Sequence, residues 1–354
     1  MQRALFWAER GRGGTSPNPL VGAVVVSPDG VVVGQGAHLA AGGPHAEIHA
    51  LAAAGARAAG ATLYCTLEPC CHVGRTGPCV DRIVAAGVAR VVAAMPDPNP
   101  LVAGEGFAYL RNHGVAVESG VCASEAARQN EAYLTWRIRR RPFVIAKAAV
   151  SADGFVGRHD RREALTGRDA NRWFQRQRAE VDAIAVGAQT MLVDDPLLTA
   201  REVFRARPLA RVLFDWRLRV PATARVFSTL AAGPVIMIVA EETARARREN
   251  VAALGRSGVD VETFRTRDLR EVLGRLADRG ILSLLVEGGP TLQTAFGKAG
   301  LIDRIQRAQT PRIRGGGVAA PPSVFEPASV SGRAARTLQL GEDTLTEFDV
   351  YRTD

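Results

Sequence analysis

The sequence predicts two different α/β domains. At roughly 150 residues per domain, a chain of 354 residues holds about two. Strand and helix patterns alternate through the first 120 residues, as in a layered βαβ domain. A helical stretch then ends before Pro142, and a second series of apolar strands follows without repeating the first half. We therefore expect an N-terminal domain over 1–122, a helical connector over 123–141 and a C-terminal domain over 142–354.

Periodicity and turn residues place the elements of the first half. Pro28, Asp29 and Gly30 predict a hairpin turn, and Gly55 and Gly60 close an alanine-rich helix that begins at His45. In chain order we expect a helix over 1–12, strands over 21–27 and 31–33, a helix over 45–59, a strand over 63–66, a helix over 79–86, a strand over 88–92 and a helix over 123–140.

The second half contains apolar strands separated by helices or loops. The strands are expected over 143–150, 183–187, 210–214, 235–240 and 281–286. The last strand precedes Glu287-Gly288-Gly289-Pro290-Thr291, which predicts a glycine turn and a helix with proline in its first turn. Free N–H groups at such a helix start bind phosphate, although a glycine turn after a strand is also a common structural feature.

Composition excludes several classes of protein. Hydrophobic residues make up 47% and charged residues 23%, which is unlike disordered, collagen-like or disulfide-scaffold chains. No apolar run approaches the roughly 18 residues of a membrane span. Glu9, Arg10 and Arg12 interrupt the N-terminal apolar residues, so we expect no secretory signal and a cytoplasmic location. Five cysteines are an odd and clustered set, which favours metal binding or catalysis over disulfides.

The chain is strongly basic, but its net charge alone does not identify the kind of acidic partner. The formal net charge is +9, and 43 of the 45 basic residues are arginines. Genome composition alone can produce such a bias, and the arginines are spread out except for one dense run, Arg137–Arg141. We therefore favour a phosphorylated small molecule over nucleic acid as the acidic partner.

One histidine and two cysteines of the first half are candidate zinc ligands. His45 opens a helix, Cys70 lies on a loop, and Cys79 begins the next helix. A catalytic Zn²⁺ takes three protein ligands and keeps a fourth position for water, which His45, Cys70 and Cys79 satisfy. Backbone dipoles at the helix start are expected to favour the thiolate of Cys79.

Glu47 is expected to be a general acid and base rather than a ligand. It lies two residues after His45, roughly 200° around a helix, so the two side chains are not stacked neighbours. The pair matches the H-x-E part of a zinc-deaminase signature whose second part is P-C-x-x-C. Position 73 is valine, so Cys79 must supply the second thiolate. Zinc would lower the pKa of water, and Glu47 would carry its proton to the ring nitrogen and then to the leaving amine.

The remaining cysteines have no assigned role. Cys65 and Cys122 are expected to be small buried apolar residues, and Cys71 is a spare thiol beside a ligand.

These residues lie in segments that resemble the deaminase half of the bifunctional riboflavin-biosynthesis deaminase/reductase family. The segments are Pro17-Asn18-Pro19-Leu20-Val21-Gly22, Pro44-His45-Ala46-Glu47, Glu68-Pro69-Cys70 and Gly74-Arg75-Thr76-Gly77-Pro78-Cys79. The resemblance covers about residues 1–122, and the C-x8-C spacing is typical of the family. It implies a cytidine-deaminase-like three-layer α/β/α domain and a 2,5-diaminopyrimidinone substrate with a phosphoribosylamino group. It further implies a ring contact from Asn18 and ribose or phosphate contacts from His38, His72 and Arg75.

The second half resembles the reductase half of the same family, whose fold is similar to that of dihydrofolate reductase. The matching segments are Lys147–Gly154, Asp194–Arg201 and Glu287–Thr291. The resemblance covers about residues 142–354 and implies reduction of the phosphoribosyl chain to ribityl by NADPH. By motif position, the implied NADPH contacts are Ala148, Ala164, Thr190, Asp194, Trp216, Gly289, Pro290, Thr291, Leu292, Gln293, Thr294 and Ala295. The implied substrate contacts are Arg162, Arg178, Leu198, Arg201 and Glu287.

Some residues of this half depart from the family pattern. Arg161–Thr166 replaces a serine-rich segment, Trp216 stands where a small serine is common, and Arg312 and Arg314 replace apolar or lysine positions. A deaminase with a degenerate reductase domain is therefore one alternative.

The predicted function is a zinc-dependent deaminase and an NADPH-dependent reductase on one chain. We expect a homo-oligomer that acts on a phosphorylated pyrimidine and has no nucleic-acid or membrane partner. A second alternative is a nucleic-acid base deaminase whose basic second domain binds RNA. The C-x8-C spacing and the lack of aromatic residues within Arg137–Arg141 speak against it. A third is a structural zinc module, whose ion would be closed by a fourth protein ligand.

Overall fold

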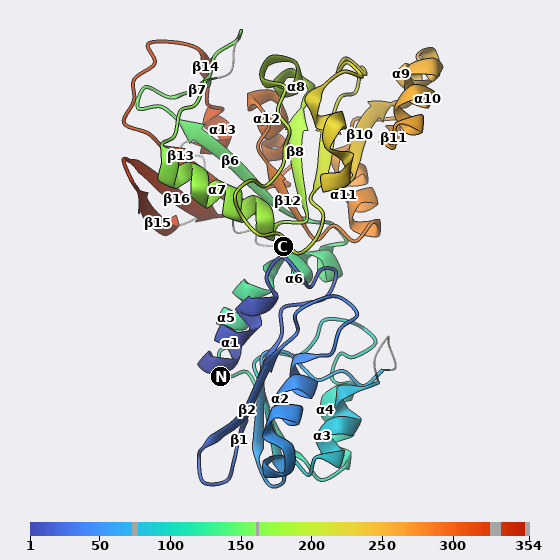
Figure 1. The fold of residues 1–354 in the computed structure, drawn as a ribbon, viewed down its shortest axis with the longest axis vertical. Coiled ribbons are helices and arrows are strands. Elements are labelled where there is room, and N and C mark those ends of the chain that lie inside the picture. Colours follow the sequence, from blue (N-terminus) through green and yellow to red (C-terminus); the bar gives the residue numbers. More distant parts are fainter. Residues whose placement is uncertain (73–76, 161–162, 326–333, 351–354) are drawn as a thin grey trace. The chain divides into compact units, whose positions relative to one another are not determined.

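The computed structural model describes residues 1–72, 77–160, 163–325 and 334–350. The chain divides into two compact units, Met1–Arg140 and Arg141–Asp354 (Figure 1). None of the helices in these ranges combines the length and the hydropathy that a membrane crossing requires.

The N-terminal unit is built on a five-stranded sheet with the strand order β2-β1-β3-β4-β5. β1 is antiparallel to β2 and β3, whereas β3, β4 and β5 are parallel. The strands are β1 (Gly22–Val26), β2 (Val32–Ala37), β3 (Thr62–Cys65), β4 (Arg90–Ala93) and β5 (Ala116–Ser119). The helices are α1 (Gln2–Ala8), α2 (Ala46–Ala54), α3 (Cys79–Ala85), α4 (Glu105–Asn112), α5 (Ala123–Gln129) and α6 (Glu131–Arg139), with 3₁₀ turns at Glu9–Gly11 and Gly55–Ala58.

Helices cover both faces of this sheet, so the unit has three layers (Figure 1). One core packs α2, α3 and α4 on the sheet through residues such as Ala50, Ile83 and Leu110. A smaller cluster of Leu5, Ala94 and Ala126 packs α1 and α5 on the other face. This is the three-layer α/β/α architecture that the sequence predicts.

Glycines in β1 and β2 let the helices lie directly on the sheet. A Cβ at Gly22 would lie 2.0 Å from the carbonyl oxygen of Ala4 in α1. A Cβ at Gly36 would lie 2.4 Å from the Cβ of His49 in α2. Because side chains alternate between faces, Gly22 on β1 and Gly36 on β2 can serve opposite layers. The close approach of α2 positions the start of that helix, where His45 and Glu47 lie.

The expected elements before residue 122 are present, and the structure adds the helix α4 and the edge strand β5 after them. The single helix expected over 123–140 is wrong, because the chain breaks at Asn130 between α5 and α6. The buried Asn130 side chain accepts a hydrogen bond from Leu20 N at 2.8 Å and donates one to Leu20 O at 3.0 Å. Asparagine has a low helix propensity, and this long-range pairing uses its side chain to fix the loop that carries Asn18.

The C-terminal unit contains a nine-stranded sheet in the order β11-β10-β9-β8-β12-β6-β13-β16-β15. Neighbours from β11 to β13 are parallel, and β16 and β15 are antiparallel at one edge. The strands are β6 (Phe143–Val150), β7 (Phe155–Gly157), β8 (Ala183–Gly187), β9 (Ala210–Phe214), β10 (Val235–Ala240), β11 (Asp260–Phe264), β12 (Ser283–Val286), β13 (Arg304–Gln309), β14 (Val318–Ala319), β15 (Ala334–Leu340) and β16 (Asp343–Asp349). The helices are α7 (Arg168–Glu180), α8 (Ala188–Asp194), α9 (Glu241–Ala246), α10 (Arg248–Arg256), α11 (Leu269–Asp278), α12 (Pro290–Lys298) and α13 (Pro322–Phe325), with a 3₁₀ segment at Arg225–Ala232.

Two hydrophobic clusters hold helices to this sheet. α11 and α12 join the main core through residues such as Leu273 and Phe296. α7 belongs to a second cluster through Ala170 and Phe174, which meets β13 and β16. The C-terminal ends of the parallel strands β8, β12 and β6 are adjacent in the sheet, which is where ligands bind in open α/β folds.

Candidate active sites in the two units

The three predicted metal ligands come together in the N-terminal unit. His45 is the N-cap of α2, Cys79 is the first residue of α3, and Cys70 follows β3 on a loop. His45 Nδ1 lies 3.2 Å from Cys79 Sγ and 3.4 Å from Cys70 Sγ. All three ligand atoms lie within 4.8 Å of one another.

These separations fit a tetrahedral zinc ion. Zn–S bonds of about 2.3 Å and Zn–N bonds of about 2.0 Å place a nitrogen and a sulfur about 3.5 Å apart at tetrahedral angles. The measured distances from His45 Nδ1 are close to that value. One imidazole and two thiolates leave a fourth position free, which is the arrangement of a catalytic rather than a structural site.

The backbone N–H at the start of α3 points toward Cys70, whereas the expectation from the sequence concerned the thiolate of Cys79. The backbone N–H of Cys79 donates to Cys70 Sγ at 3.3 Å. Hydrogen bonding from Cys79, and further from His45, lowers the pKa of Cys70 to about 4 despite its burial. The neighbouring Cys70 sulfur and burial raise the pKa of Cys79. The Cys79 amide at the helix start thus adds to the hydrogen bonds that favour a thiolate on Cys70.

Glu47 lies in the first turn of α2 and is not part of the ligand cluster. Its side chain is buried, and Oε2 has no hydrogen-bond partner among the described residues. Burial and the nearby Cys70 raise the pKa of Glu47 to about 7. A buried carboxyl with a free oxygen beside the ligands fits a group that accepts and returns a proton.

A cavity of about 340 Å³ adjoins this cluster, and three of the four substrate contacts predicted for the N-terminal unit line it. Its wall includes Asn18, His38 and His72 together with His45, Glu47 and Cys70. Since His38 Nδ1 faces the carbonyl oxygen of Pro44 at 3.1 Å, it is the donor there and Nε2 accepts from Asn18 Nδ2 at 3.0 Å. Burial lowers the pKa of His38, which keeps the ring neutral. Arg75 lies outside the described residues.

Sequence reasoning missed four residues of the cavity wall: Asp97, Asn99, Tyr133 and Arg137. Asp97 accepts hydrogen bonds from Tyr133 Oη and from Asn99 N, both at 2.9 Å. The Asp97-Pro-Asn99-Pro segment follows a predicted strand, and that signal could have identified it. Tyr133 and Arg137 lie on α6, in a stretch that the sequence suggests only as a connector.

The other three cysteines differ in their surroundings. Cys65 is fully buried in β3, as expected. Cys122 is only half-buried, because it turns the chain into α5 with a left-handed φ of 59° and lies beside Gln2. Cys71 is half-buried, with its sulfur 3.7 Å from the carbonyl oxygen of Leu101.

In the C-terminal unit, predicted substrate contacts meet at the end of β12. Arg178 on α7 forms a bidentate ion pair with Glu287, and it also donates to Thr199 O at 3.1 Å. Lys147 on β6 and Arg201 lie close enough to Glu287 to help lower its pKa. Sequence reasoning did not assign Lys147, which is half-buried with its ammonium 3.9 Å from the ring centroid of Phe174.

The glycine turn after β12 leads directly into α12, with Gly289 as N-cap and Pro290 at its start. Gly289 N donates to Thr190 Oγ1 on α8 at 3.2 Å. Leu292 and Gln293 turn inward, and Gln293 Nε2 donates to Lys147 O at 2.8 Å. The exposed or half-buried residues of this turn are Gly289, Pro290, Thr291, Thr294 and Ala295.

The remaining predicted contacts differ in how far their side chains are exposed to solvent. Ala148 on β6 and Leu198 are buried, whereas Asp194 is half-buried at the end of α8. Arg201 is exposed, and its backbone N–H donates to Gln175 Oε1 at 2.8 Å. Trp216 is half-buried and packs edge-on against Phe214 and Phe264.

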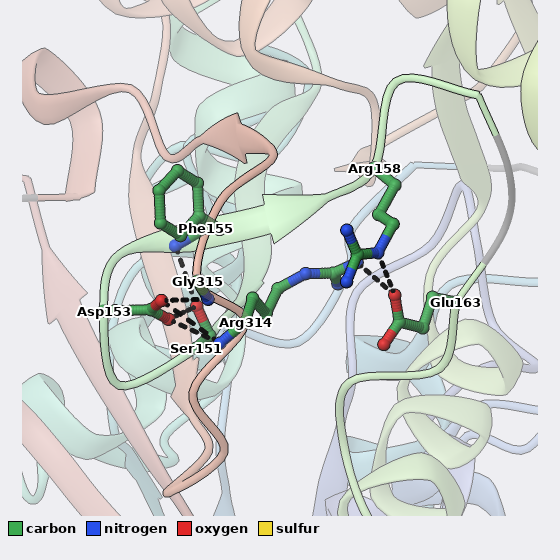
Figure 2. Close-up of polar contacts among 7 residues, drawn as sticks. All are labelled: Ser151, Asp153, Phe155, Arg158, Glu163, Arg314 and Gly315. Atoms are coloured by element: carbon green, nitrogen blue, oxygen red, sulfur yellow. Dashed lines mark hydrogen bonds and ion pairs between the residues drawn. The ribbon is translucent and has the colours of Figure 1, made fainter.

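The segment that departs from the family pattern belongs to a network of loops beyond β6 (Figure 2). Glu163 accepts hydrogen bonds from Arg158, at 2.9 Å, and from Arg314. Asp153 accepts from Ser151 Oγ at 2.6 Å and from the backbone N–H groups of Arg314 and Gly315. Ala164 is exposed beside this network, and Arg162 lies outside the described residues. Arg314 thus has a structural partner in this chain's own Glu163.

Both units match families that are known from sequence. Residues 1–95 match the cytidine and deoxycytidylate deaminase zinc-binding region, and residues 142–346 match the RibD C-terminal domain. The chain is 40% identical to riboflavin biosynthesis protein RibD of Aquifex aeolicus, over 99% of this chain and 98% of that protein. It is 41% identical to RibD of Escherichia coli K12, over 89% of this chain and 88% of that protein.

Two solved structures of relatives superpose on nearly all of this chain. Acinetobacter baumannii RibD superposes with a TM-score of 0.89 at 36% identity, covering 99% of this chain and 98% of that one. A diaminohydroxyphosphoribosylaminopyrimidine deaminase/5-amino-6-(5-phosphoribosylamino)uracil reductase of Thermotoga maritima superposes with a TM-score of 0.85 at 31% identity, covering 99% and 97%. The zinc-binding match supports zinc, and the reductase domain implies a nicotinamide cofactor. The chain belongs to the riboflavin biosynthesis protein RibD family and is a bifunctional deaminase and reductase.

Proposed function

We propose that this enzyme deaminates 2,5-diamino-6-(5-phosphoribosylamino)pyrimidin-4-one and then reduces the ribosyl chain of the product with NADPH. The observation that carries the first step is the cluster of His45, Cys70 and Cys79 ligand atoms within 4.8 Å, with the buried Glu47 beside it. The activity by which the Thermotoga maritima protein is named supports the substrate for both steps, since that protein matches 99% of this chain.

In the deaminase cavity, each residue has a defined task. Zinc held by His45, Cys70 and Cys79 supplies a Lewis acid that makes water a stronger nucleophile at neutral pH. Glu47 takes a proton on its unpartnered Oε2, delivers it to the ring nitrogen and helps the amine leave as ammonia. Asn18 orients the pyrimidine ring, since its amide is held by His38. His38, His72 and Arg75 contact the ribose or the phosphate.

In the C-terminal unit, the cofactor and the sugar are held by residues on β6 and α8 and by the segments that follow β9 and β12. Bound there, NADPH would supply a hydride to C1 of the ribosyl chain, and with one proton from solvent this would give the open ribityl chain and NADP⁺. The N-terminus of α12 carries a partial positive charge that favours a phosphate of the cofactor. Its predicted contacts are Ala148, Ala164, Thr190, Asp194, Trp216 and Gly289–Ala295.

The substrate of the reductase site is held by charged residues. Arg178 and Arg201 bind phosphate or sugar oxygens through their planar guanidinium groups. Glu287 fixes Arg178 and faces the same region, with Leu198 and Arg162 as further contacts. The predicted homo-oligomer and the absence of a nucleic-acid partner stay predictions, and the family match does not favour the base-deaminase alternative.

A two-part assay tests this proposal. Purified enzyme is given the diaminopyrimidinone phosphate with and without NADPH, and ammonia release and NADPH oxidation are followed separately. We expect ammonia in both conditions and oxidation only after deamination. Ammonia without oxidation would show that the C-terminal unit is a degenerate reductase.

Variants of two glutamates test the role of Glu47. Glu47→Gln should abolish ammonia release while zinc stays bound, because the amide cannot carry the proton. Glu105→Gln, which changes an exposed acid on α4, is the matched control and should keep full activity. Retained turnover in Glu47→Gln would contradict the acid/base role.

A further inference from the structure

The cavity beside the ligand cluster contains one permanent cation among its described lining residues, Arg137. Arg137 is the first residue of the dense arginine run, and it lies on α6 within the N-terminal unit. The other lining residues described there are neutral or acidic at neutral pH, apart from the histidines. Among the described residues, the guanidinium of Arg137 is therefore the fixed positive charge that a phosphorylated substrate in this cavity meets.

Aromatic rings hold that guanidinium in place. Its central carbon lies 4.5 Å from the ring centroid of Trp136 and 5.6 Å from that of Tyr133. Such stacking fixes the plane of an arginine and leaves the N–H groups at its edge available for an anion. Arg137 Nε is buried and has no hydrogen-bond partner among the described residues. A buried donor without an acceptor is costly, so a ligand that supplies the acceptor binds favourably.

Asp97 of the cavity wall does not supply the acceptor that Arg137 Nε lacks. Asp97 uses its Oδ1 to accept from Tyr133 Oη and Asn99 N, both at 2.9 Å. Arg137 and His72 act on Asp97 only through charge: burial raises the pKa of Asp97, and their positive potential opposes that rise. His72 Nδ1 is also buried without a partner in the described part of the chain, and it lines the same cavity.

We propose that Arg137 is a specificity-determining residue of the deaminase site, where it binds the phosphate of the phosphoribosyl group. The proposal rests on the proposed function, which puts a phosphorylated substrate in this cavity. Glu47 and the metal ligands recognise the ring, and Arg137 recognises the charged end of the same molecule. The unpartnered Nδ1 of His72 adds a hydrogen bond on that side.

Kinetics with two substrates test the proposal. Arg137→Met keeps the length of the apolar stem against Trp136 but removes the charge. We expect kcat/KM for ammonia release to fall roughly 10- to 100-fold with the 5′-phosphorylated substrate, mainly through KM, because a charge-assisted hydrogen bond is lost. With the dephosphorylated riboside, the variant and the wild type should differ by less than about twofold. Arg137→Lys should recover part of the loss.

Arg139→Met is the matched control, since it removes an exposed arginine from the same helix. It should leave kcat/KM for both substrates unchanged, and zinc content should be equal in all variants. An equal loss on both substrates would show that Arg137 only supports the fold of the cavity, and no loss on either would show that it contacts no phosphate. Either result overturns the proposal.

Titration with ribose 5-phosphate separates this proposal from the proposed function. Arg137→Met should lose one class of binding sites that Arg139→Met retains, whether or not the diaminopyrimidinone is turned over. Absent turnover by the wild type, with binding that depends on Arg137, would reject the proposed substrate and keep the phosphate site. Identical isotherms for the two variants would reject the phosphate site.

Discussion

Arg178 and Glu287 form a bidentate ion pair that joins α7 to the segment after β12. Arg178 Nε donates to Oε1 of Glu287 at 2.8 Å, and Nη2 donates to Oε2 at 2.6 Å. The side chains are only 14% and 10% exposed. Burial alone would raise the pKa of Glu287, but the Arg178 charge and hydrogen bonds, with the Lys147 charge, outweigh it and lower the pKa to about 2. The pair is therefore ionised at neutral pH and organises the predicted sugar site.

Removing the carboxylate should destabilise the C-terminal unit strongly. Glu287→Gln leaves the buried Arg178 without its anion, which costs roughly 3–5 kcal/mol in comparable buried pairs. Urea unfolding near pH 7 measures the loss. The matched control is Glu342→Gln, whose partner Arg312 and own side chain are about half exposed, and it should cost less than about 1 kcal/mol.

The same pair predicts how stability depends on pH. The folded pKa of Glu287 is about 2 and lies below the usual value of 4.5, so its stabilisation is complete above about pH 4.5 and is lost as pH falls toward about 2. The difference in unfolding free energy between wild type and Glu287→Gln should stay constant from about pH 7 to about pH 5.5 and shrink near about pH 3.5. A gap that grows on acidification would be inconsistent with this ion pair.

Adjacent cysteines offer a sharp test of the metal site. Cys70→Ala removes a proposed ligand whose sulfur lies 3.4 Å from His45 Nδ1, and we expect zinc affinity to fall by more than roughly 100-fold together with ammonia release. Cys71→Ala changes the next thiol, which lies against Leu101 O instead, and should retain both. Metal analysis of the two purified variants decides. Equal zinc contents would mean that Cys70 is not a ligand.

Glu68 is expected to hold the cavity wall that carries Asp97. Its buried carboxylate accepts hydrogen bonds from three backbone N–H groups, those of Asp97 at 3.2 Å, Gly104 at 3.0 Å and Phe107 at 3.1 Å. Glu68→Gln replaces an acceptor oxygen with a donor that faces N–H groups, so we expect a loss of roughly 1–3 kcal/mol in unfolding free energy and a higher KM for deamination. A variant with wild-type stability and KM would contradict this role.

The cluster of candidate ligands could be proposed from sequence because each of its residues stands in a short local pattern. His45, Cys70 and Cys79 lie at element starts and on a loop, and the H-x-E pattern defines the tasks of His45 and Glu47 without knowledge of the fold. The hydrogen bond from the Cys79 amide to Cys70 Sγ could not be predicted this way. It depends on where the Cys79 amide points, which only the packing of the loop against α3 fixes.

Long-range pairing explains the elements that the sequence did not reveal. Asn130 breaks an apparently continuous helix because its side chain binds the backbone of Leu20, 110 residues away. Arg137 belongs to a run that suggests a solvated connector, yet it lines the cavity. Short edge strands such as β5 have a polar, largely exposed pattern, so their hydrophobic periodicity is weak.

The packing of α2 on β2 predicts that a single methyl group will disturb the deaminase site. In Gly36→Ala, the new Cβ would lie 2.4 Å from His49 Cβ, 2.7 Å from Ala46 O and 2.8 Å from Ala50 N. α2 must shift to relieve these contacts, which costs roughly 1–3 kcal/mol, and it carries His45 and Glu47 with it. We expect a lower urea midpoint and slower ammonia release. Gly274→Ala in α11 is the matched control: nothing lies within 4 Å of its Cβ, and helix propensity should stabilise that variant by about 0.5–1 kcal/mol. If Gly36→Ala unfolded at the same urea concentration as the wild type, α2 would not lie against β2 as described.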